Sequence, residues 1–263
     1  MKFGICYDLS KADQIAAAGF DYIEGHVVNI AKMSDEEFAQ LKARFDTLPI
    51  KPEAFCVLFP GNLKVTGPEV DMAAIEAYID GVFPRLAALG AYPVVFGSGG
   101  ARRVPDGFDR AKAWHQLIAV GRLLGEKAKE HGLVIALEPL NTGETNIINT
   151  QMEGLDLVAD VNHSHFRILS DFYHLYLAGE STPEVAACGD FLMHAHMANP
   201  KGRIMPAEGD GMDYVSFFKG LKQAGYDARV SYEGAINDEE GLSKMLAFIK
   251  GEAAKAGIQT EGK

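Results

Sequence analysis

The sequence has few cysteines and far fewer basic than acidic residues. Cys6, Cys56 and Cys188 are odd in number, widely spaced and without a CxxC pair, which argues against a disulfide framework and against a thiolate zinc site. The 25 lysines and arginines face 36 aspartates and glutamates, so the formal net charge is −11. Binding to nucleic acid or to an anionic membrane needs clustered positive charge. We therefore expect neither as a partner.

Long hydrophobic runs are also missing. No stretch approaches the roughly 18 apolar residues of a membrane span, and the start MKFGICYD lacks the charged and apolar regions of a signal peptide. Together with the unpaired cysteines, these features predict a cytoplasmic protein. The hydrophobic fraction of 48% is nevertheless ordinary for a globular domain with a full core.

Short β-rich runs alternate with longer helical patterns along the whole chain. Eight runs have strand character: 3–6, 20–25, 52–59, 92–98, 133–139, 166–171, 191–197 and 228–234. Helical spacing of apolar residues is clear over five segments between and after them: 34–45, 72–90, 109–132, 213–227 and 238–255. This rhythm predicts a single (β/α)8 TIM barrel over 1–263, with a frayed tail over 256–263.

Alternate residues of a barrel strand point into the barrel and out toward the helices. On the seventh strand-like run this alternation places Leu192, His194 and His196 inside, because the other face is wholly apolar. His196 then lies at the C-terminal end of the strand. His194, one pleat deeper, is expected to lie in the core or to orient the neighbouring histidine, with metal ligation as the alternative.

Four consecutive strands end, by the same alternation, in inward ionisable residues: Glu138, Asp171, His196 and Glu233. TIM barrels carry their chemistry at these C-terminal ends. Three carboxylates around one imidazole cannot stay ionised together without a cation. Oxygen-rich ligation with one nitrogen suits Mn²⁺, Mg²⁺ or Co²⁺ best, with Zn²⁺ as an alternative. The sequence therefore predicts one divalent metal ion held by these four residues.

Four segments of the second half of the chain carry these residues: LEPLNTGET, SDFYH, HAHMANPKGR and VSYEG. They resemble the signature regions of the sugar isomerase/epimerase family with xylose-isomerase-like TIM barrels, especially its hydroxypyruvate isomerase and ketose 3-epimerase branches. The resemblance implies the same four metal ligands and a catalytic role for Glu138 and Glu233. It also implies substrate contacts by Glu144, His174 and Arg203.

What the resemblance implies is a metal-dependent isomerase or epimerase that acts on a small keto-sugar or hydroxy-keto acid by proton transfer through an enediolate. Members of the family often form homo-oligomers. Two alternatives use the same site: a keto-sugar dehydratase or eliminating lyase, and a non-catalytic metal-dependent sugar-binding protein. A DNA-repair endonuclease on this barrel would need further histidine ligands, which the strand ends VLFPG and FGSGG lack.

Two features of the first half are open at this point. Glu24, at the end of the second strand-like run, either reaches the barrel mouth or forms a surface salt bridge. The stretch GSGGARR (97–103) offers backbone N–H groups and two cations to an anionic substrate group, or is a flexible loop.

Overall fold

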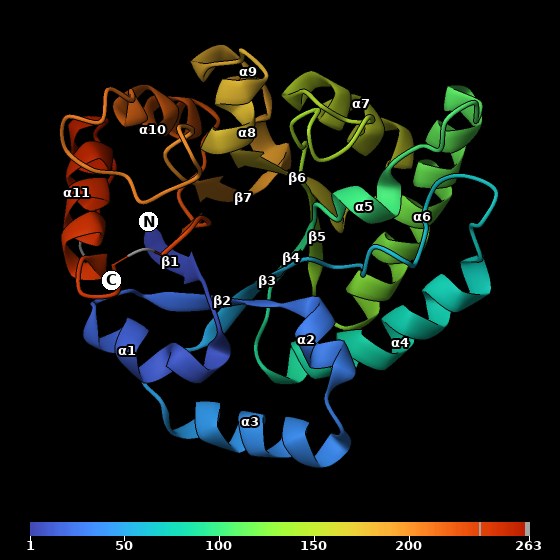
Figure 1. Ribbon diagram of the computed structural model, residues 1–263, viewed down its shortest axis with the longest axis horizontal. Coiled ribbons are helices and arrows are strands. Elements are labelled where there is room, and N and C mark those ends of the chain that lie inside the picture. Colours follow the sequence, from blue (N-terminus) through green and yellow to red (C-terminus); the bar gives the residue numbers. More distant parts are fainter. Residues whose placement is uncertain (237, 261–263) are drawn as a thin grey trace.

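The strands close into a barrel in the order in which they occur along the chain. The computed structural model describes residues 1–236 and 238–260, and in it eight parallel strands pair in sequence from β1 to β8, with β8 returning to β1. The helices lie around the outside of this barrel (Figure 1). The predicted (β/α)8 TIM barrel is confirmed.

The strands are short and begin or end within a few residues of the predicted runs. Their bounds are β1 (Lys2–Cys6), β2 (Tyr22–His26), β3 (Pro52–Cys56), β4 (Pro93–Phe96), β5 (Val134–Leu137), β6 (Phe166–Asp171), β7 (Leu192–Met197) and β8 (Arg229–Tyr232). The largest difference is at β3, which was expected to continue to residue 59. Val57 adopts a positive φ of 53°, so the chain leaves the extended conformation directly after Cys56.

Each strand is followed by at least one helix. The helices are α1 (Ala12–Ala17), α2 (Val27–Lys32), α3 (Asp35–Thr47), α4 (Met72–Ala88), α5 (Gly99–Arg102), α6 (Arg110–Glu130), α7 (Gln151–Val161), α8 (Phe172–Leu177), α9 (Thr182–Ala187), α10 (Tyr214–Gln223) and α11 (Leu242–Lys255), with 3₁₀ turns η1 (Leu9–Lys11) and η2 (Gly189–Phe191). The five long helical patterns of the sequence correspond to α3, α4, α6, α10 and α11.

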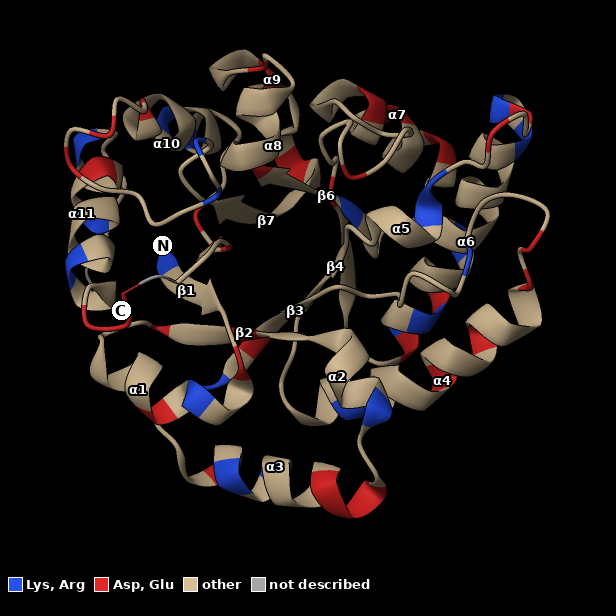
Figure 2. Ribbon diagram, viewed as in Figure 1, with Lys and Arg blue, Asp and Glu red and all other residues tan. Residues whose placement is uncertain are grey.

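Helix α3 shows how local sequence sets a boundary. Ser34 accepts a hydrogen bond from the backbone N–H of Glu37, whose side chain accepts one from the backbone N–H of Ser34. This capping box satisfies two helix-end donors. Acidic residues gather in the first turn and Arg44 lies in the last, as Figure 2 shows, which matches the helix dipole. Charges of both signs also lie on the other outer helices.

The apolar core has two parts. The larger part lies between the strands and the helices, and the smaller part fills the barrel with five residues: Cys6, Cys56, Val95, Ala136 and Leu169. Leu192 was predicted to point into the barrel, but it packs in the larger part. The pairing of β6 with β7 shifts register after Ile168, which pairs with Leu192, so the alternation is interrupted before His194.

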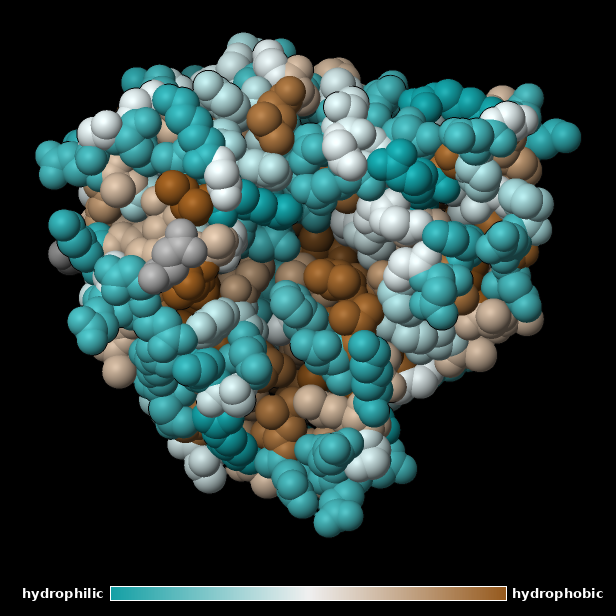
Figure 3. All heavy atoms as spheres, viewed as in Figure 1, coloured by the Kyte–Doolittle hydropathy of each residue, from teal (hydrophilic) through white to brown (hydrophobic). Residues whose placement is uncertain are grey.

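The end of the chain and the barrel exterior complete the fold. Ile258 is buried and its backbone N–H donates to Ala253, while residues 261–263 of the expected frayed tail lie outside the described residues. Among the helices that the structure describes, none combines the length and the apolar character that crossing a membrane requires. The face in Figure 3 is hollowed near its centre, where hydrophobic side chains gather between hydrophilic ones.

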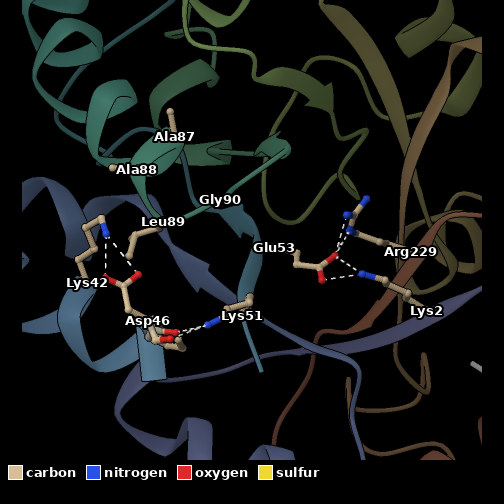
Figure 4. A pocket seen from close by; sticks show the side chains of 11 residues that line it. Lys2, Lys42, Asp46, Lys51, Glu53, Ala87, Ala88, Leu89, Gly90 and Arg229 are labelled. Carbon is tan, nitrogen blue, oxygen red and sulfur yellow. Dashed lines mark hydrogen bonds and ion pairs between the residues drawn. The ribbon is translucent and has the colours of Figure 1, made fainter. Parts of the chain in front are cut away.

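A cavity of about 440 Å³ lies at the N-terminal ends of the strands, opposite the predicted site (Figure 4). Both carboxylates that line it, Asp46 and Glu53, are paired with cations. Glu53 pairs with Lys2 at 2.6 Å and with Arg229 at 2.7 Å, and Lys42 pairs with Asp46 at 2.9 Å. Arg229 begins β8 and therefore lies at the end of the barrel opposite the C-terminal mouth.

Two helical glycines, one exposed and one buried, test how the outer helices pack against one another. An added Cβ at exposed Gly81 of α4 would meet nothing within 4 Å, whereas one at buried Gly121 of α6 would lie 2.5 Å from a methyl carbon of Val161. We expect Gly81→Ala to raise the free energy of unfolding by about 0.5–1 kcal/mol and Gly121→Ala to lower it by about 1–3 kcal/mol. Denaturant unfolding of the two variants measures both values. Equal effects would contradict the described contact of α6 with α7.

Candidate metal centre and active site

The four predicted ligands come together at the C-terminal end of the barrel. Glu138 follows β5, Asp171 ends β6, His196 lies in β7 and Glu233 follows β8. One ligand atom from each residue lies within 4.8 Å of those of the other three. The alternation of the strands thus produces one compact group of three carboxylates and an imidazole.

Three atoms of this group are buried and lack a hydrogen-bond partner among the described residues: Glu138 Oε1, Asp171 Oδ2 and His196 Nδ1. The other oxygen of Asp171 is used, because it accepts a hydrogen bond of 2.9 Å from the backbone N–H of Tyr173 at the start of α8. A buried polar atom without a partner is costly. Two carboxylate oxygens and one imidazole nitrogen aimed at the same point fit a divalent cation.

His196 is oriented by Glu24. Its Nε2 lies 3.0 Å from Glu24 Oε1, while its Nδ1 lies 3.2 Å from Glu233 and 3.5 Å from Glu138. A carboxylate beside Nε2 keeps a proton on that nitrogen. Nδ1 is then the atom left to bind a metal ion.

Glu24 is fully buried, so the surface salt bridge that the sequence left open is excluded. Its second oxygen accepts hydrogen bonds from His194 Nε2 at 2.8 Å and from Ser231 Oγ at 2.5 Å. His194 therefore contacts Glu24 and acts on His196 through it. Glu24 occupies an inward position of β2, but the residues that it contacts are far away in the sequence, so this role could not be predicted from the sequence.

The carboxylates have different proton affinities. Burial, followed by the charges of Glu138 and Glu233, raises the pKa of Asp171 to about 7. Burial and the charge of Glu233 also raise the pKa of Glu138. Burial acts in the same direction on Glu233, yet the charges of His196 and Arg203 outweigh it and lower its pKa to about 2.

His196 responds to the same charges in the opposite sense. Burial disfavours its imidazolium form, but the charges of Glu24 and Glu233 raise its pKa well above the ordinary value. Without a metal ion, Asp171 is therefore partly protonated near pH 7 and His196 carries an additional proton. A bound cation has to replace these protons.

The three residues expected to contact substrate lie around this group. Arg203 donates to Glu233 Oε2 at 2.5 Å and to Glu144 Oε1 at 3.2 Å, and its guanidinium lies 4.7 Å from the centre of the Tyr173 ring. Arg203 adopts a positive φ of 51° in the loop after β7. Its charge is therefore engaged inside the mouth and does not extend into solvent.

His174 is buried and points toward the same centre. Its Nδ1 accepts a hydrogen bond of 3.0 Å from the backbone N–H of Asn141, and its Nε2 lies 3.6 Å from Asp171 and 3.9 Å from Glu138. Burial, together with the charge of Arg203, lowers its pKa to about 3. The ring is neutral and carries its proton on Nε2, where it can donate to a group in the site.

The stretch 97–103 serves the site in a way that the sequence did not indicate. Arg102 is fully buried, and its guanidinium donates to the carbonyl oxygens of Phe96 at 3.1 Å and Glu138 at 2.6 Å. It supports the backbone of Glu138 and does not face an anion. An added Cβ at Gly97 would lie 2.3 Å from Glu138 Oε2, so glycine at this position leaves room for the carboxylate.

A family model for the xylose isomerase-like TIM barrel matches residues 12–252. The chain belongs to this family. The match covers most of the sequence, including all four strand ends of the candidate metal centre, and it confirms the family to which the sequence motifs pointed.

The family members most similar in sequence include sugar epimerases. The chain is 31% identical over 120 residues to the 3-dehydro-D-guloside 4-epimerase of Escherichia coli strain K12, and this part spans 45% of each protein. It is 26% identical over 268 residues to the D-psicose 3-epimerase of Enterocloster bolteae, covering 89% of this chain and 80% of the relative. The match thus spans less than half of the first relative and most of the second.

Solved structures of sugar epimerases have the same fold as this chain. The crystal structure of the D-psicose 3-epimerase of Clostridium cellulolyticum H10 with D-tagatose has a TM-score of 0.85 at 20% sequence identity. The superposition covers 98% of this chain and 100% of that one. The barrel is therefore closely similar along its whole length.

We predict that Glu24→Gln weakens Mn²⁺ binding by about 10- to 100-fold, the usual effect of losing a group that orients a metal-bound histidine. The amide keeps the shape but cannot hold the proton on His196 Nε2 as a carboxylate does. Calorimetric titration of the metal-free protein with Mn²⁺ measures the affinity. Glu53→Gln, which alters a paired carboxylate at the other end of the barrel, should leave the affinity unchanged. Unaltered binding in Glu24→Gln would show that His196 needs no such support.

We also predict that metal binding weakens as the solution becomes more acidic. Below the pKa of about 7 that burial gives Asp171, a cation must displace a proton from this carboxyl. The apparent affinity for Mn²⁺ should then fall by about tenfold or more for each pH unit below 7. Titrations at several pH values, in buffers of different ionisation enthalpy, measure the affinity and the protons released. A pH-independent affinity with no proton release would contradict the described site.

Proposed function

We propose that the protein is a divalent-metal-dependent sugar epimerase that moves a proton on the carbon beside a ketose carbonyl group. The observation that carries this proposal is the pair Glu138 and Glu233, whose carboxylates reach the same buried centre from β5 and β8 and lie 3.5 Å and 3.2 Å from His196 Nδ1. Environments that push two carboxylate pKa values apart are typical of acid–base pairs. Here the pKa of Glu138 is raised and that of Glu233 is lowered to about 2.

Epimerisation requires a base and an acid on opposite faces of the substrate carbon. One glutamate takes the proton from the carbon next to the carbonyl group, and the electron pair of the broken C–H bond moves toward the carbonyl oxygen. The other glutamate then gives a proton to the opposite face of the same carbon as the carbonyl group forms again. The number of protons is conserved, and the configuration of the carbon is inverted.

The residues around the two glutamates have distinct tasks in this proposal. Arg203 holds Glu233 by two contacts, from Nη2 to its carboxylate at 2.5 Å and from Nε to its backbone carbonyl at 3.3 Å. Glu144, held in place by Arg203 and by Asn141 at 2.9 Å, presents an acceptor to substrate hydroxyl groups. His174 presents its Nε2 proton to a substrate oxygen.

A metal ion would be held by Glu138, Asp171, His196 and Glu233, whose unpartnered atoms and mutual distances fit such a group. When bound, it would supply Lewis-acid stabilisation of negative charge on the substrate oxygens. We favour Mn²⁺, Mg²⁺ or Co²⁺ because three of the four ligands are carboxylates.

The relatives support a ketose as substrate. The proteins named above are 3- and 4-epimerases of sugars and sugar derivatives, and the structure with D-tagatose has a sugar in the same fold. An isomerase that needs only one base, or an eliminating lyase, would use the same first proton transfer. The second carboxylate at the centre favours the epimerase over both.

The central test replaces each glutamate by glutamine, which keeps its size and one oxygen ligand. We predict that Glu138→Gln and Glu233→Gln each retain metal while overall conversion of a ketose falls by about 10² or more, the effect of losing a general base. Ketoses are incubated with the Mn²⁺-loaded protein in D₂O and followed by NMR. Each variant should exchange the substrate proton of only one epimer, the one that its remaining base can reach.

The controls separate catalysis from folding and metal binding. Glu130→Gln, at the exposed end of α6, should convert ketoses at the normal rate. Asp171→Ala should lose both metal and activity, while Glu144→Ala should keep the metal and lose turnover. Near-normal turnover in either glutamine variant would show that this glutamate is only a ligand. Deuterium incorporation with loss of a substrate hydroxyl group would indicate a lyase, and absence of any exchange a sugar-binding protein.

A further inference from the structure

Two cysteines lie beside the metal centre and have no part in the proposed reaction. Cys6 ends β1 and Cys56 ends β3, and both are free and buried. Their sulfur atoms and a carboxylate oxygen of Glu233 lie within 4.8 Å of one another. The barrel therefore brings together a second group of donor atoms that shares one carboxylate with the first.

The two sulfur atoms make only weak contacts. Cys6 Sγ lies 4.0 Å from His196 Nε2, a nitrogen that already faces Glu24 at 3.0 Å. Cys56 Sγ donates to the carbonyl oxygen of Gly25 at 3.6 Å. These contacts would be given up readily for a bond to a metal ion.

The donor set differs in chemistry from the neighbouring one. Two thiols and one carboxylate suit thiophilic divalent cations such as Zn²⁺ and Cd²⁺, whereas the group around Asp171 suits harder cations. His26 is paired with Cys56 across the β2–β3 ladder and lines the same cavity as Cys6.

A path to these donors exists from the barrel mouth. A cavity of about 440 Å³ is lined by Cys6, His26 and Glu233 together with residues of the loops after β1, β7 and β8. A cation can therefore reach Cys6 without opening the barrel, and Cys56 Sγ lies within 4.8 Å of Cys6 Sγ. Water in the cavity can fill a remaining coordination position.

We propose that Cys6, Cys56 and Glu233 form a second, thiophilic cation site that competes with the catalytic metal centre for Glu233. Binding forms two metal–sulfur bonds and releases two thiol protons to solvent. Because Glu233 belongs to both groups, Zn²⁺ or Cd²⁺ at this site draws its carboxylate toward the sulfur atoms and disturbs the reacting centre. This inhibitory consequence rests on the proposed function, whereas the binding itself does not.

The binding test uses Cd²⁺ and does not depend on activity. Metal-free protein is titrated with Cd²⁺ while the ultraviolet charge-transfer band of cadmium–thiolate bonds is recorded. We expect a band in the native protein and in the control variant Cys188→Ser. Cys188 is hydrogen-bonded to the side chain of Gln151 and the backbone carbonyl of Glu184, and it is not part of the proposed site. The band should be lost in the double variant Cys6→Ser/Cys56→Ser. No band in the native protein, or a band that survives in the double variant, would overturn the proposal.

The inhibition test follows with the Mn²⁺-loaded protein and a ketose that it epimerises. Added Cd²⁺ or Zn²⁺ should inhibit the native protein and Cys188→Ser at least tenfold more strongly than Cys6→Ser/Cys56→Ser. Each protein is compared with its own rate before addition. Equal inhibition of all three would show that the cation acts at the catalytic centre alone. If no ketose is converted by any of them, the proposed function fails, while the cadmium band still decides whether the site exists.

Discussion

Repulsion between buried carboxylates is the constraint on which the C-terminal end of this barrel depends. Glu24, Glu138, Asp171 and Glu233 approach one imidazole, His196, from four different strands. In water such charges would be screened, but burial strengthens their interaction and disfavours ionisation. Some surrounding residues relieve this repulsion through hydrogen bonds and ion pairs. Where they do not, the remaining negative charge can bind a cation.

Part of the repulsion is relieved by fixed partners. Glu24 is satisfied by two histidines and a serine, and Glu233 by Arg203 and His196. Glu138 and Asp171 are less well compensated, and the pKa of each is raised. The atoms without hydrogen-bond partners are those that face the common centre. The site therefore has fixed hydrogen-bond partners on its outer side and uncompensated negative charge at its centre. This combination is what a metal centre with catalytic carboxylates requires.

The barrel, the order of its strands and the four inward residues could be predicted from the sequence, because alternation in a parallel strand fixes which side chains share the interior. The prediction was wrong at Leu192, where a register shift between β6 and β7 interrupts the alternation. The buried roles of Glu24 and Arg102 could not be predicted, since their partners are distant in the sequence or are backbone carbonyl groups. The same reason applies to Cys6 and Cys56, whose spacing argues against a thiolate site although the barrel brings them together.

The most direct measurement of the central claim is a crystal structure of the Mn²⁺-loaded protein, with anomalous scattering recorded at the manganese absorption edge. The account predicts one strong peak coordinated by Glu138, Asp171, Nδ1 of His196 and Glu233, with Nε2 of His196 still bound to Glu24. A peak elsewhere, or no peak in protein that has bound Mn²⁺ in solution, would contradict the claim that the unpartnered atoms of this site exist to hold a divalent cation.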